Sequence, residues 1–415
     1  IDDEGQTVYI PEIHTTAKDQ TTKINHTEAN DKATIVDTVY YSHLLPGKEY
    51  TVHGKLMDKK TGEPILIDDK EITASTTFTA EKSEGSVDVI FTFDASILAP
   101  KTVVAFEYME YEGIEIAVHA DIDDEDQTVY IPKIHTTAVG EDTQDHIEKA
   151  KEEAVIVDTV SYEGLEIGRE YTVAGKLMDK ETGEPILVNG EEVTASETFT
   201  AETEEGGIDI TFTFDSSALA GKKIVAFEDV TYEGISIGTH EDLTDEDQTI
   251  SYPEIHTTAA DQASGSKTMT LGSSVTLVDT VTYKGLTAGK TYVVKGTIMD
   301  KASGQPIGVT AETTFTAEAS DGSVEVTFTF DTTKLQGKTL VVFETLYDTQ
   351  GNPIVAHSDL NDEDQTVSVP VQPVIPPVVT GDDSSPMPYV LSLLAALAAA
   401  VAVVAVQVRR KRKQA

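Results

Sequence analysis

The chain has 415 residues, of which 73 are acidic and 30 are basic, so its formal net charge at pH 7 is -43. A surface this acidic repels nucleic acid and anionic membranes, which argues against both as partners of the folded part. The acid excess is typical of a solvated, self-repelling surface, and binding of a cationic ligand is the alternative. The chain has no cysteine, which excludes disulfides and thiolate metal sites.

The chain contains sequence repeats, and its first residues resemble the end of one repeat and not the start. The sequence begins IDDEGQTVYI, without a methionine or a signal peptide, so we expect a C-terminal fragment or a processed form. Gln6 has no matching threonine upstream. Residues 1–9 are therefore predicted to be the last strand of a truncated preceding repeat.

Three similar units follow. The sequence IHTTA occurs at 13–17, 134–138 and 255–259, and each copy is followed about a hundred residues later by DEDQT. This periodicity predicts tandem repeats over residues 10–130, 131–251 and 252–369. The connections between them are short, which indicates a fairly stiff rod.

The pattern within each unit is that of β-strands. GSVEVTFTFD, for example, alternates apolar and polar side chains, and turn sequences such as TGEP separate the β-branched stretches. No helical period is sustained outside the C-terminal segment. Several short alternating strands per hundred residues predict an all-β fold of Ig-like antiparallel β-sandwich domains.

Each unit carries the same polar residues in the same order. Strand alternation directs Thr15 and Asp37 toward the buried face, where an unpaired carboxylate is costly and must be hydrogen-bonded or protonated. A glutamate in VAFE or VVFE, a histidine and a glutamine follow. The recurring sets are Thr15, Asp37, Glu107, His119 and Gln127; Thr136, Asp158, Glu228, His240 and Gln248; and Thr257, Asp279, Glu344, His357 and Gln365. Repetition by descent and satisfied core polar groups are the alternative explanation.

These motifs resemble the T-Q ester-bond domains, also called VaFE repeats, of Gram-positive surface adhesins and stalks. The resemblance rests on IHTTA, VDTV, VAFE, the histidine and DEDQT, and it covers all three units. It implies CnaB-like sandwiches in which a threonine hydroxyl attacks a glutamine amide, releases ammonia and leaves an intramolecular ester. The implied cross-links are Thr15–Gln127, Thr136–Gln248 and Thr257–Gln365.

The remaining residues of each set would assist this reaction. A hydroxyl is a weak nucleophile and an amide a poor electrophile, so both need activation. We expect the histidine to take the threonine proton and a protonated carboxyl to polarise the amide carbonyl, with the choice between Asp and Glu left open. Each site would react once, so the chain is expected not to be an enzyme, and no cofactor is implied.

The C-terminus has the layout of an anchor. Residues 370–387 form a proline-rich spacer that contains VVTGDD, and 388–415 contain an apolar stretch followed by RRKRK. This predicts a transmembrane helix with a cytoplasmic basic tail and an extracellular location for the repeats. The region is similar to a sortase signal cut between Thr380 and Gly381, with Pro377-Val378 in place of the usual Leu-Pro. A plain membrane anchor is the alternative.

The expected partners follow from this layout: peptidoglycan through a sortase, the membrane through the C-terminal helix, and a host or neighbouring-cell ligand through an upstream region. Two alternatives to the cross-linked stalk remain open. The acidic loops around 121–126, 242–247 and 359–364 could bind calcium, although they lack EF-hand spacing, and solvated loops are the other possibility. The repeats could also bind a ligand directly.

Overall fold

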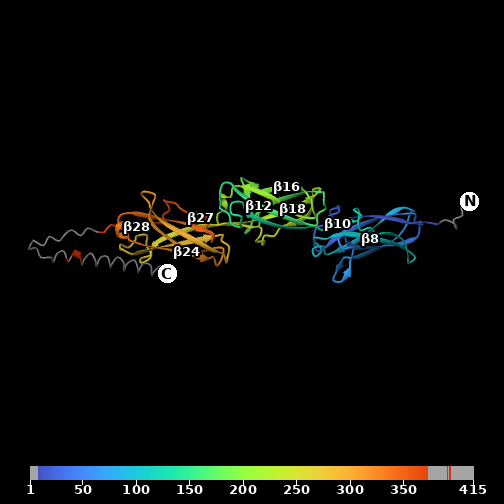
Figure 1. The fold of residues 1–415 in the computed structure, drawn as a ribbon, viewed down its shortest axis with the longest axis horizontal. Coiled ribbons are helices and arrows are strands. Elements are labelled where there is room, and N and C mark those ends of the chain that lie inside the picture. The colour runs from blue at the N-terminus through green and yellow to red at the C-terminus, as the bar shows by residue number, and fades with distance from the viewer. Residues whose placement is uncertain (1–7, 373–389, 391, 394–415) are drawn as a thin grey trace, which may run out of the picture. The chain divides into compact units, whose positions relative to one another are not determined.

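Each repeat folds into a three-stranded and a five-stranded antiparallel sheet (Figure 1). The computed structural model describes residues 8–372, 390, 392 and 393. The predicted all-β, antiparallel architecture is confirmed. Gln6 and the predicted sortase motif at Thr380 and Gly381 lie outside the described residues.

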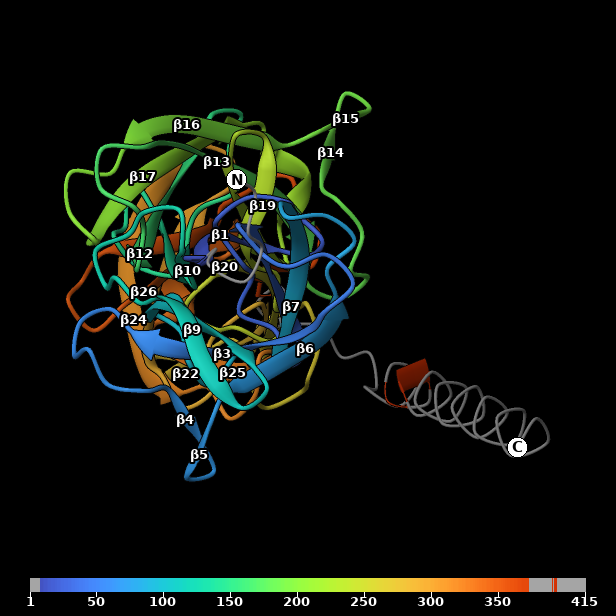
Figure 2. The same cartoon turned by 90° about the vertical axis from the view of Figure 1, so that its right-hand side faces the viewer.

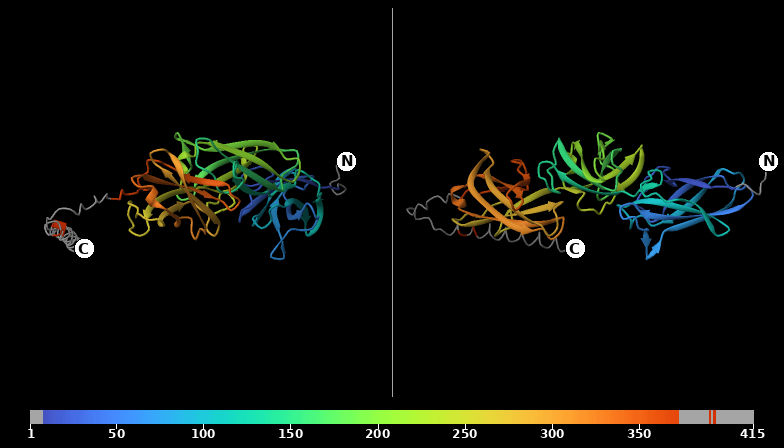
Figure 3. Two further views of the ribbon diagram at one scale, coloured as in Figure 1. Left: turned by 60° about the vertical axis from the view of Figure 1, so that its left-hand side comes forward. Right: turned by 45° about the vertical axis from the view of Figure 1, so that its right-hand side comes forward.

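The first repeat contains ten strands. They are β1 (Glu12–Asp19), β2 (Ala33–Ser42), β3 (Glu49–Asp58), β4 (Leu66–Ile67), β5 (Lys70–Glu71), β6 (Thr73–Thr79), β7 (Gly85–Phe93), β8 (Thr102–Tyr111), β9 (Ile114–His119) and β10 (Thr128–Tyr130). One sheet has the order β1-β2-β7, and the other has the order β10-β8-β3-β6 with β9 also paired to β8. The β4–β5 hairpin projects from these sheets (Figures 2 and 3).

The second repeat has the same strand plan. Its elements are β11 (Lys133–Gly140), β12 (Ala154–Glu163), β13 (Glu170–Asp179), β14 (Leu187–Val188), β15 (Glu191–Glu192), β16 (Thr194–Thr200), β17 (Glu205–Phe214), the 3-10 helix η2 (Ser217–Leu219), β18 (Lys222–Tyr232), β19 (Ile235–His240) and β20 (Thr249–Tyr252). Its two sheets repeat the pairing of the first.

The third repeat replaces the projecting hairpin and the following strand with one long strand. Its elements are β21 (Glu254–Asp261), β22 (Val275–Lys284), β23 (Thr291–Asp300), β24 (Gln305–Thr316), β25 (Gly322–Phe330), the 3-10 helix η3 (Thr332–Lys334), β26 (Thr339–Tyr347), β27 (Pro353–His357) and β28 (Thr366–Ser368). The long strand β24 pairs with β23 across a register shift.

Side-chain alternation explains how the two sheets face each other. Every second residue of β2 is buried, so its Ile35 and Val39 pack with Val52 and Leu56 of β3 in one apolar core. The second and third repeats have equivalent cores. Burial of one face of each sheet is the main force that holds such a sandwich together.

The first and last strands of a repeat belong to different sheets but lie next to each other. In the first repeat, β1 pairs with β2, whereas β10 pairs with β8. A backbone hydrogen bond nevertheless runs from Ala17 N to Asp126 O (2.8 Å), and Ala105 N donates to Gln127 O (3.1 Å). The turn into β10 therefore places the side chain of Gln127 between the sheets.

The loop between the first two strands of a repeat contacts the following repeat. His26 Nε2 lies 3.0 Å from Tyr171 Oη, and the ring also packs against Tyr130 and Tyr232. At the next junction, Ile147 is buried in the core of the third repeat. In both cases, a loop of one repeat therefore packs against residues of the next repeat.

The predicted transmembrane helix is not tested by the described residues. None of the helices in the described part of the chain is long and apolar enough to cross a membrane. Almost all of the predicted span, including its basic tail, lies outside that part.

Candidate functional site

The predicted threonine and glutamine of the first repeat meet in its interior. Thr15 points inward from β1 and is 2% exposed, whereas its neighbour Thr16 is only partly buried. Gln127 is fully buried, and its Nε2 lies 2.5 Å from Thr15 Oγ1. A nucleophilic hydroxyl and an amide group that are 112 positions apart in sequence are thus in contact.

The same contact forms in the other two repeats. Gln248 Nε2 contacts Thr136 Oγ1, and Gln365 Nε2 lies 2.9 Å from Thr257 Oγ1. All four side chains are at most 2% exposed. Three separate copies of the fold therefore bring together the pairs that the sequence motifs predicted.

A buried glutamate completes this contact in each repeat. In the first, Glu107 Oε2 accepts hydrogen bonds from Gln127 Nε2 at 2.7 Å and from Thr15 Oγ1 at 3.3 Å. Glu228 and Glu344 make the corresponding contacts. One carboxyl group therefore touches both reacting side chains, although it comes from β8, in the sheet opposite β1.

The predicted aspartate lies beside this glutamate. Asp37 is fully buried on β2, and among the described residues neither of its oxygens has a hydrogen-bond partner. Its charge acts on Glu107, and because two neighbouring buried carboxylates repel each other, one of the two carboxyl groups keeps a proton. Burial raises the pKa of both groups.

The proton belongs mainly to the glutamate. Burial, followed by the proximity and charge of Asp37, raises the pKa of Glu107 to about 11. The same causes raise the pKa of Glu228 to about 10 and that of Glu344 to about 11. At neutral pH the glutamate of each pair therefore keeps its proton, and the glutamic acid can donate a hydrogen bond.

The histidine is held by a carboxylate that the sequence motifs did not single out. His119 Nε2 lies 2.9 Å from Asp124 Oδ2, and its Nδ1 is buried without a partner among the described residues. A carboxylate only accepts hydrogen bonds, so Nε2 carries the proton and Nδ1 keeps its lone pair. His240 with Asp245 (2.9 Å) and His357 with Asp362 (3.1 Å) repeat the arrangement.

The position of the histidine is coupled to the site through its strand. His119 pairs with Glu107 across β9 and β8. The hydroxyl of Thr15, however, donates to Glu107 rather than to the histidine. The hydrogen bond expected between threonine and histidine is not among the contacts of the described residues.

The aspartates that hold the histidines were assigned by sequence only to acidic loops. The signal that could have identified them is their constant position, five residues after the histidine and three before the glutamine. Asp124 also accepts the backbone N–H of Asp126 at 2.8 Å, so it shapes the turn that delivers Gln127. Among the residues that the structure describes, no group of three or more His, Asp or Glu is placed to hold a metal ion.

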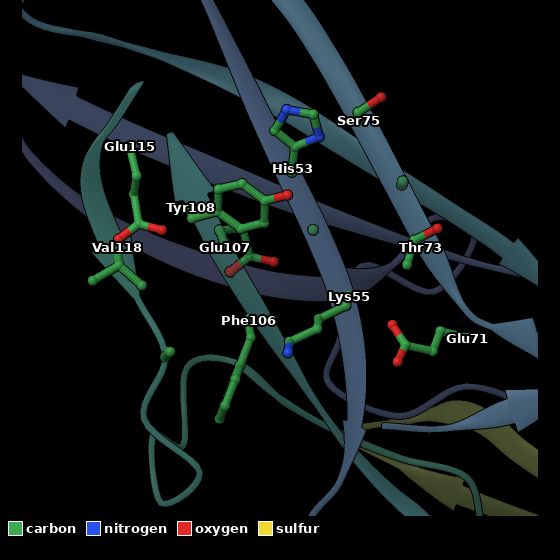
Figure 4. A pocket seen from close by; sticks show the side chains of 13 residues that line it. His53, Lys55, Glu71, Thr73, Ser75, Phe106, Glu107, Tyr108, Glu115 and Val118 are labelled. Carbon is green, nitrogen blue, oxygen red and sulfur yellow. The ribbon is translucent and has the colours of Figure 1, made fainter. Parts of the chain in front are cut away.

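A glycine that the sequence motifs did not predict lies opposite each glutamate. Gly54 on β3 pairs with Glu107 on β8, and the outer face of these strands carries His53, Lys55 and Tyr108 (Figure 4). His53 and Tyr108 stack with their ring centroids 4.8 Å apart. The outer residues differ between repeats, since Ala174 and Asp229 take these places in the second, but the inner glycine recurs.

The sequence model of the T-Q ester bond containing domain matches residues 11–131, 132–252 and 253–369. The chain belongs to this family. Its three T-Q domains account for most of the chain and contain the three recurring sets of threonine, aspartate, glutamate, histidine and glutamine. A comparison with curated proteins finds no match.

Solved structures similar to these T-Q domains include bacterial adhesins. Two crystal forms of an adhesin from Mobiluncus mulieris, described as containing intramolecular disulfide, isopeptide and ester bond cross-links, share 14% and 15% identity with the chain. Each match covers 61% of this chain and 88% of the adhesin, with a TM-score of 0.27. A tetra-tandem repeat from a large adhesion protein shares 17% identity, with coverages of 84% and 72% and a TM-score of 0.21.

Proposed function

We propose that the chain is a cell-wall-anchored surface stalk whose three domains each close an autocatalytic ester between threonine and glutamine. The observation that carries this proposal is the buried contact of threonine hydroxyl, glutamine amide and glutamate carboxyl group, which recurs in three domains. Membership of the T-Q family supports it. The cross-link would give each domain mechanical and proteolytic resistance.

The reaction forms one bond and breaks one. Thr15 Oγ attacks the amide carbon of Gln127, the C–N bond breaks, and the nitrogen leaves as ammonia with the hydroxyl proton. For attack, the hydroxyl turns from Glu107 to the lone pair of His119 Nδ1, which takes the proton and later delivers it to the departing nitrogen. Asp124 holds the imidazole in the required tautomer and stabilises its protonated form.

The glutamic acid stabilises the charge that forms on the carbonyl oxygen of the glutamine amide. A half-turn of the planar amide exchanges Nε2 and Oε1 and places the carbonyl oxygen against Glu107 Oε2. The carboxyl proton then stabilises the negative charge that develops on this oxygen, at a site shielded from water. Asp37, in turn, keeps that proton on the glutamate by its own charge. Each domain reacts once, so the chain is not an enzyme acting on a substrate.

Surface anchoring rests on the sequence alone. The proline-rich spacer, the sortase-like motif at Thr380–Gly381, the apolar stretch and the basic tail support attachment to peptidoglycan or the membrane. In this arrangement the three domains lie outside the cell and present an upstream adhesive region to a host or neighbouring cell. No contact among the described residues favours the calcium-binding alternative.

Intact-mass spectrometry of the purified, denatured chain tests the ester. The full chain should weigh less than its sequence by three ammonias, and Thr15→Ala should reduce the deficit to two. Thr16→Ala is the matched control, because this neighbour is outside the contact, and it should keep all three. A wild-type chain at its full sequence mass would refute the proposed function.

A further inference from the structure

The glycine opposite each glutamate lies in ordinary strand backbone. Gly54, Gly175 and Gly296 pair with Glu107, Glu228 and Glu344 in the register of the central strands. None of the three has a positive φ, so the backbone conformation does not require glycine there. A glycine inside a strand normally weakens it, so the missing side chain needs another reason.

That reason is an aromatic ring from the opposite sheet. A Cβ added to Gly54 would lie 2.5 Å from Phe91 Cζ and 3.3 Å from Glu107 Oε1. At Gly175 it would meet Ile210 Cδ1 at 2.5 Å and Phe212 Cζ at 2.6 Å, and at Gly296 it would collide with Phe328 Cζ. In each domain the tip of a phenylalanine ring thus borders the space that a methyl group would need, and in the first and third domains Oε1 of the glutamate borders the same space.

The glutamate oxygen that borders this space makes no hydrogen bond among the described residues. Phe91, Phe212 and Phe328 are at most 1% exposed. Oε1 of each facing glutamate is buried without a partner among the described residues, while Oε2 contacts threonine and glutamine. A buried apolar ring beside the same space excludes water from the surroundings of Oε1 and leaves Oε2 as the oxygen available to the reacting groups.

We propose that these glycine–phenylalanine pairs are positioning residues for the ester-forming reaction, which seal the acid pair from water and press the glutamate toward threonine and glutamine. The inference rests on the proposed function. The seal accounts for burial being the largest cause of the raised glutamate pKa in all three domains. Without the seal, water would solvate the carboxylate and the carboxyl group would lose its proton at lower pH.

Gly85, another glycine with a closely packed neighbour, provides a control that distinguishes the proposed positioning role from ordinary packing. A Cβ at Gly85 would lie 2.5 Å from Tyr41 Oη, which is as close as the contact at Gly54. Gly85 begins β7, and the nearest atoms to its added Cβ all belong to Tyr41 rather than to the acid pair. Gly85→Ala therefore adds the same methyl group, with a similar clash, without touching the site.

The test uses the full chain and follows closure of the first domain with time. Chains are made by cell-free synthesis, unfolded immediately in guanidinium, refolded in buffers from pH 5 to 9 and sampled for the Thr15–Gln127 cross-linked peptide by mass spectrometry. The unchanged second and third domains report folding and recovery in the same molecules. Gly54→Ala should slow closure of the first domain at least tenfold and move the alkaline fall in its rate to lower pH.

Three further variants decide the interpretation. Phe91→Leu, which removes the ring tip, should slow closure in the same way, and Gly54→Ala combined with Phe91→Leu should recover rate because the added methyl fills the vacated space. Gly85→Ala should keep the wild-type rate and pH profile. If Gly54→Ala and Phe91→Leu both close with the rate and pH profile of Gly85→Ala, the inference is overturned. Failure of the wild-type domains to close would instead overturn the proposed function.

Discussion

At the scale of single residues, the pairing of His119 with Asp124 yields a direct prediction. Asp124→Asn keeps the oxygen that accepts the N–H of Asp126, but its amide can donate to His119 Nε2 and so shift the imidazole proton to Nδ1. We expect closure of the first domain to slow on the order of a hundredfold or more. Time-resolved mass spectrometry measures this, with Asp123→Asn, an exposed change in the same loop, as the control. Equal rates for the two variants would exclude the proposed role of Asp124.

The raised glutamate pKa values predict how stability depends on pH before the ester forms. In a chain carrying Thr15→Ala, Thr136→Ala and Thr257→Ala, each folded glutamate keeps its proton up to a pH near 10 or 11, while the unfolded one loses it near 4.5. The folded state thus binds more protons in between, so stability falls as pH rises, by up to about 1.4 kcal/mol per pH unit per domain. Urea midpoints at pH 5.5 and 8.5 measure the effect.

The control for this pH dependence removes the titrating groups. Adding Glu107→Gln, Glu228→Gln and Glu344→Gln to the unlinked chain keeps neutral side chains of similar shape at the sites. The decline in midpoint between the two pH values should then become smaller. An unchanged decline would show that other groups cause it.

At the scale of elements, the alternation of β1 and β2 was enough to predict that Thr15 and Asp37 face inward. It could not predict that Glu107 would touch both reacting groups, because β8 lies in the other sheet and the contact spans 92 positions. The motif resemblance is what grouped Glu107 with Thr15 and Gln127. Asp124 and Gly54 were not predicted, because their roles depend on contacts between strands. The anchor remains a prediction, since it lies outside the described residues.

The loop between β1 and β2 of the first domain, which contacts the second domain, should respond to acid. His26 is fully buried, Asn25 Oδ1 and Tyr171 Oη bond its two nitrogens, and burial followed by the charge of Arg169 lowers its pKa to about 4. The docked loop favours neutral histidine, so its stabilisation is complete above pH 6.5 and is lost as pH falls toward 4, a change on the order of 3 kcal/mol.

Nuclear magnetic resonance titration of the His26 ring measures this directly, with a midpoint near pH 4 expected. His26→Ile is the matched variant, since Ile147 occupies the corresponding bridge position at the second junction. It should remove the acid-induced loosening of the first junction, observed as exchange broadening of Tyr171. A midpoint near 6.5 would mean that the loop is not docked in solution.

At the scale of the whole molecule, the esters would decide how the chain responds to tension. Each closes a loop of about a hundred residues, worth roughly 4.7 kcal/mol in a chain-entropy description. Under force the closed domains cannot extend between their linked residues. In single-molecule pulling, each threonine-to-alanine change should add one unfolding step of up to about 400 Å, because about 110 residues at 3.3–3.6 Å each become free. Equal contour lengths for wild type and variants would contradict the cross-link.

The spacing of the linked pairs has a consequence for damage to the backbone. The paired threonines and glutamines lie close to the two ends of each domain, and only the short stretches from Gln127 to Thr136 and from Gln248 to Thr257 fall between consecutive pairs. Once the esters are closed, a nick at any peptide bond between a linked threonine and its glutamine leaves the two pieces joined as one molecule. Between Thr15 and Gln365, only a cut within those stretches would sever the chain, and the first of them includes the buried Ile131.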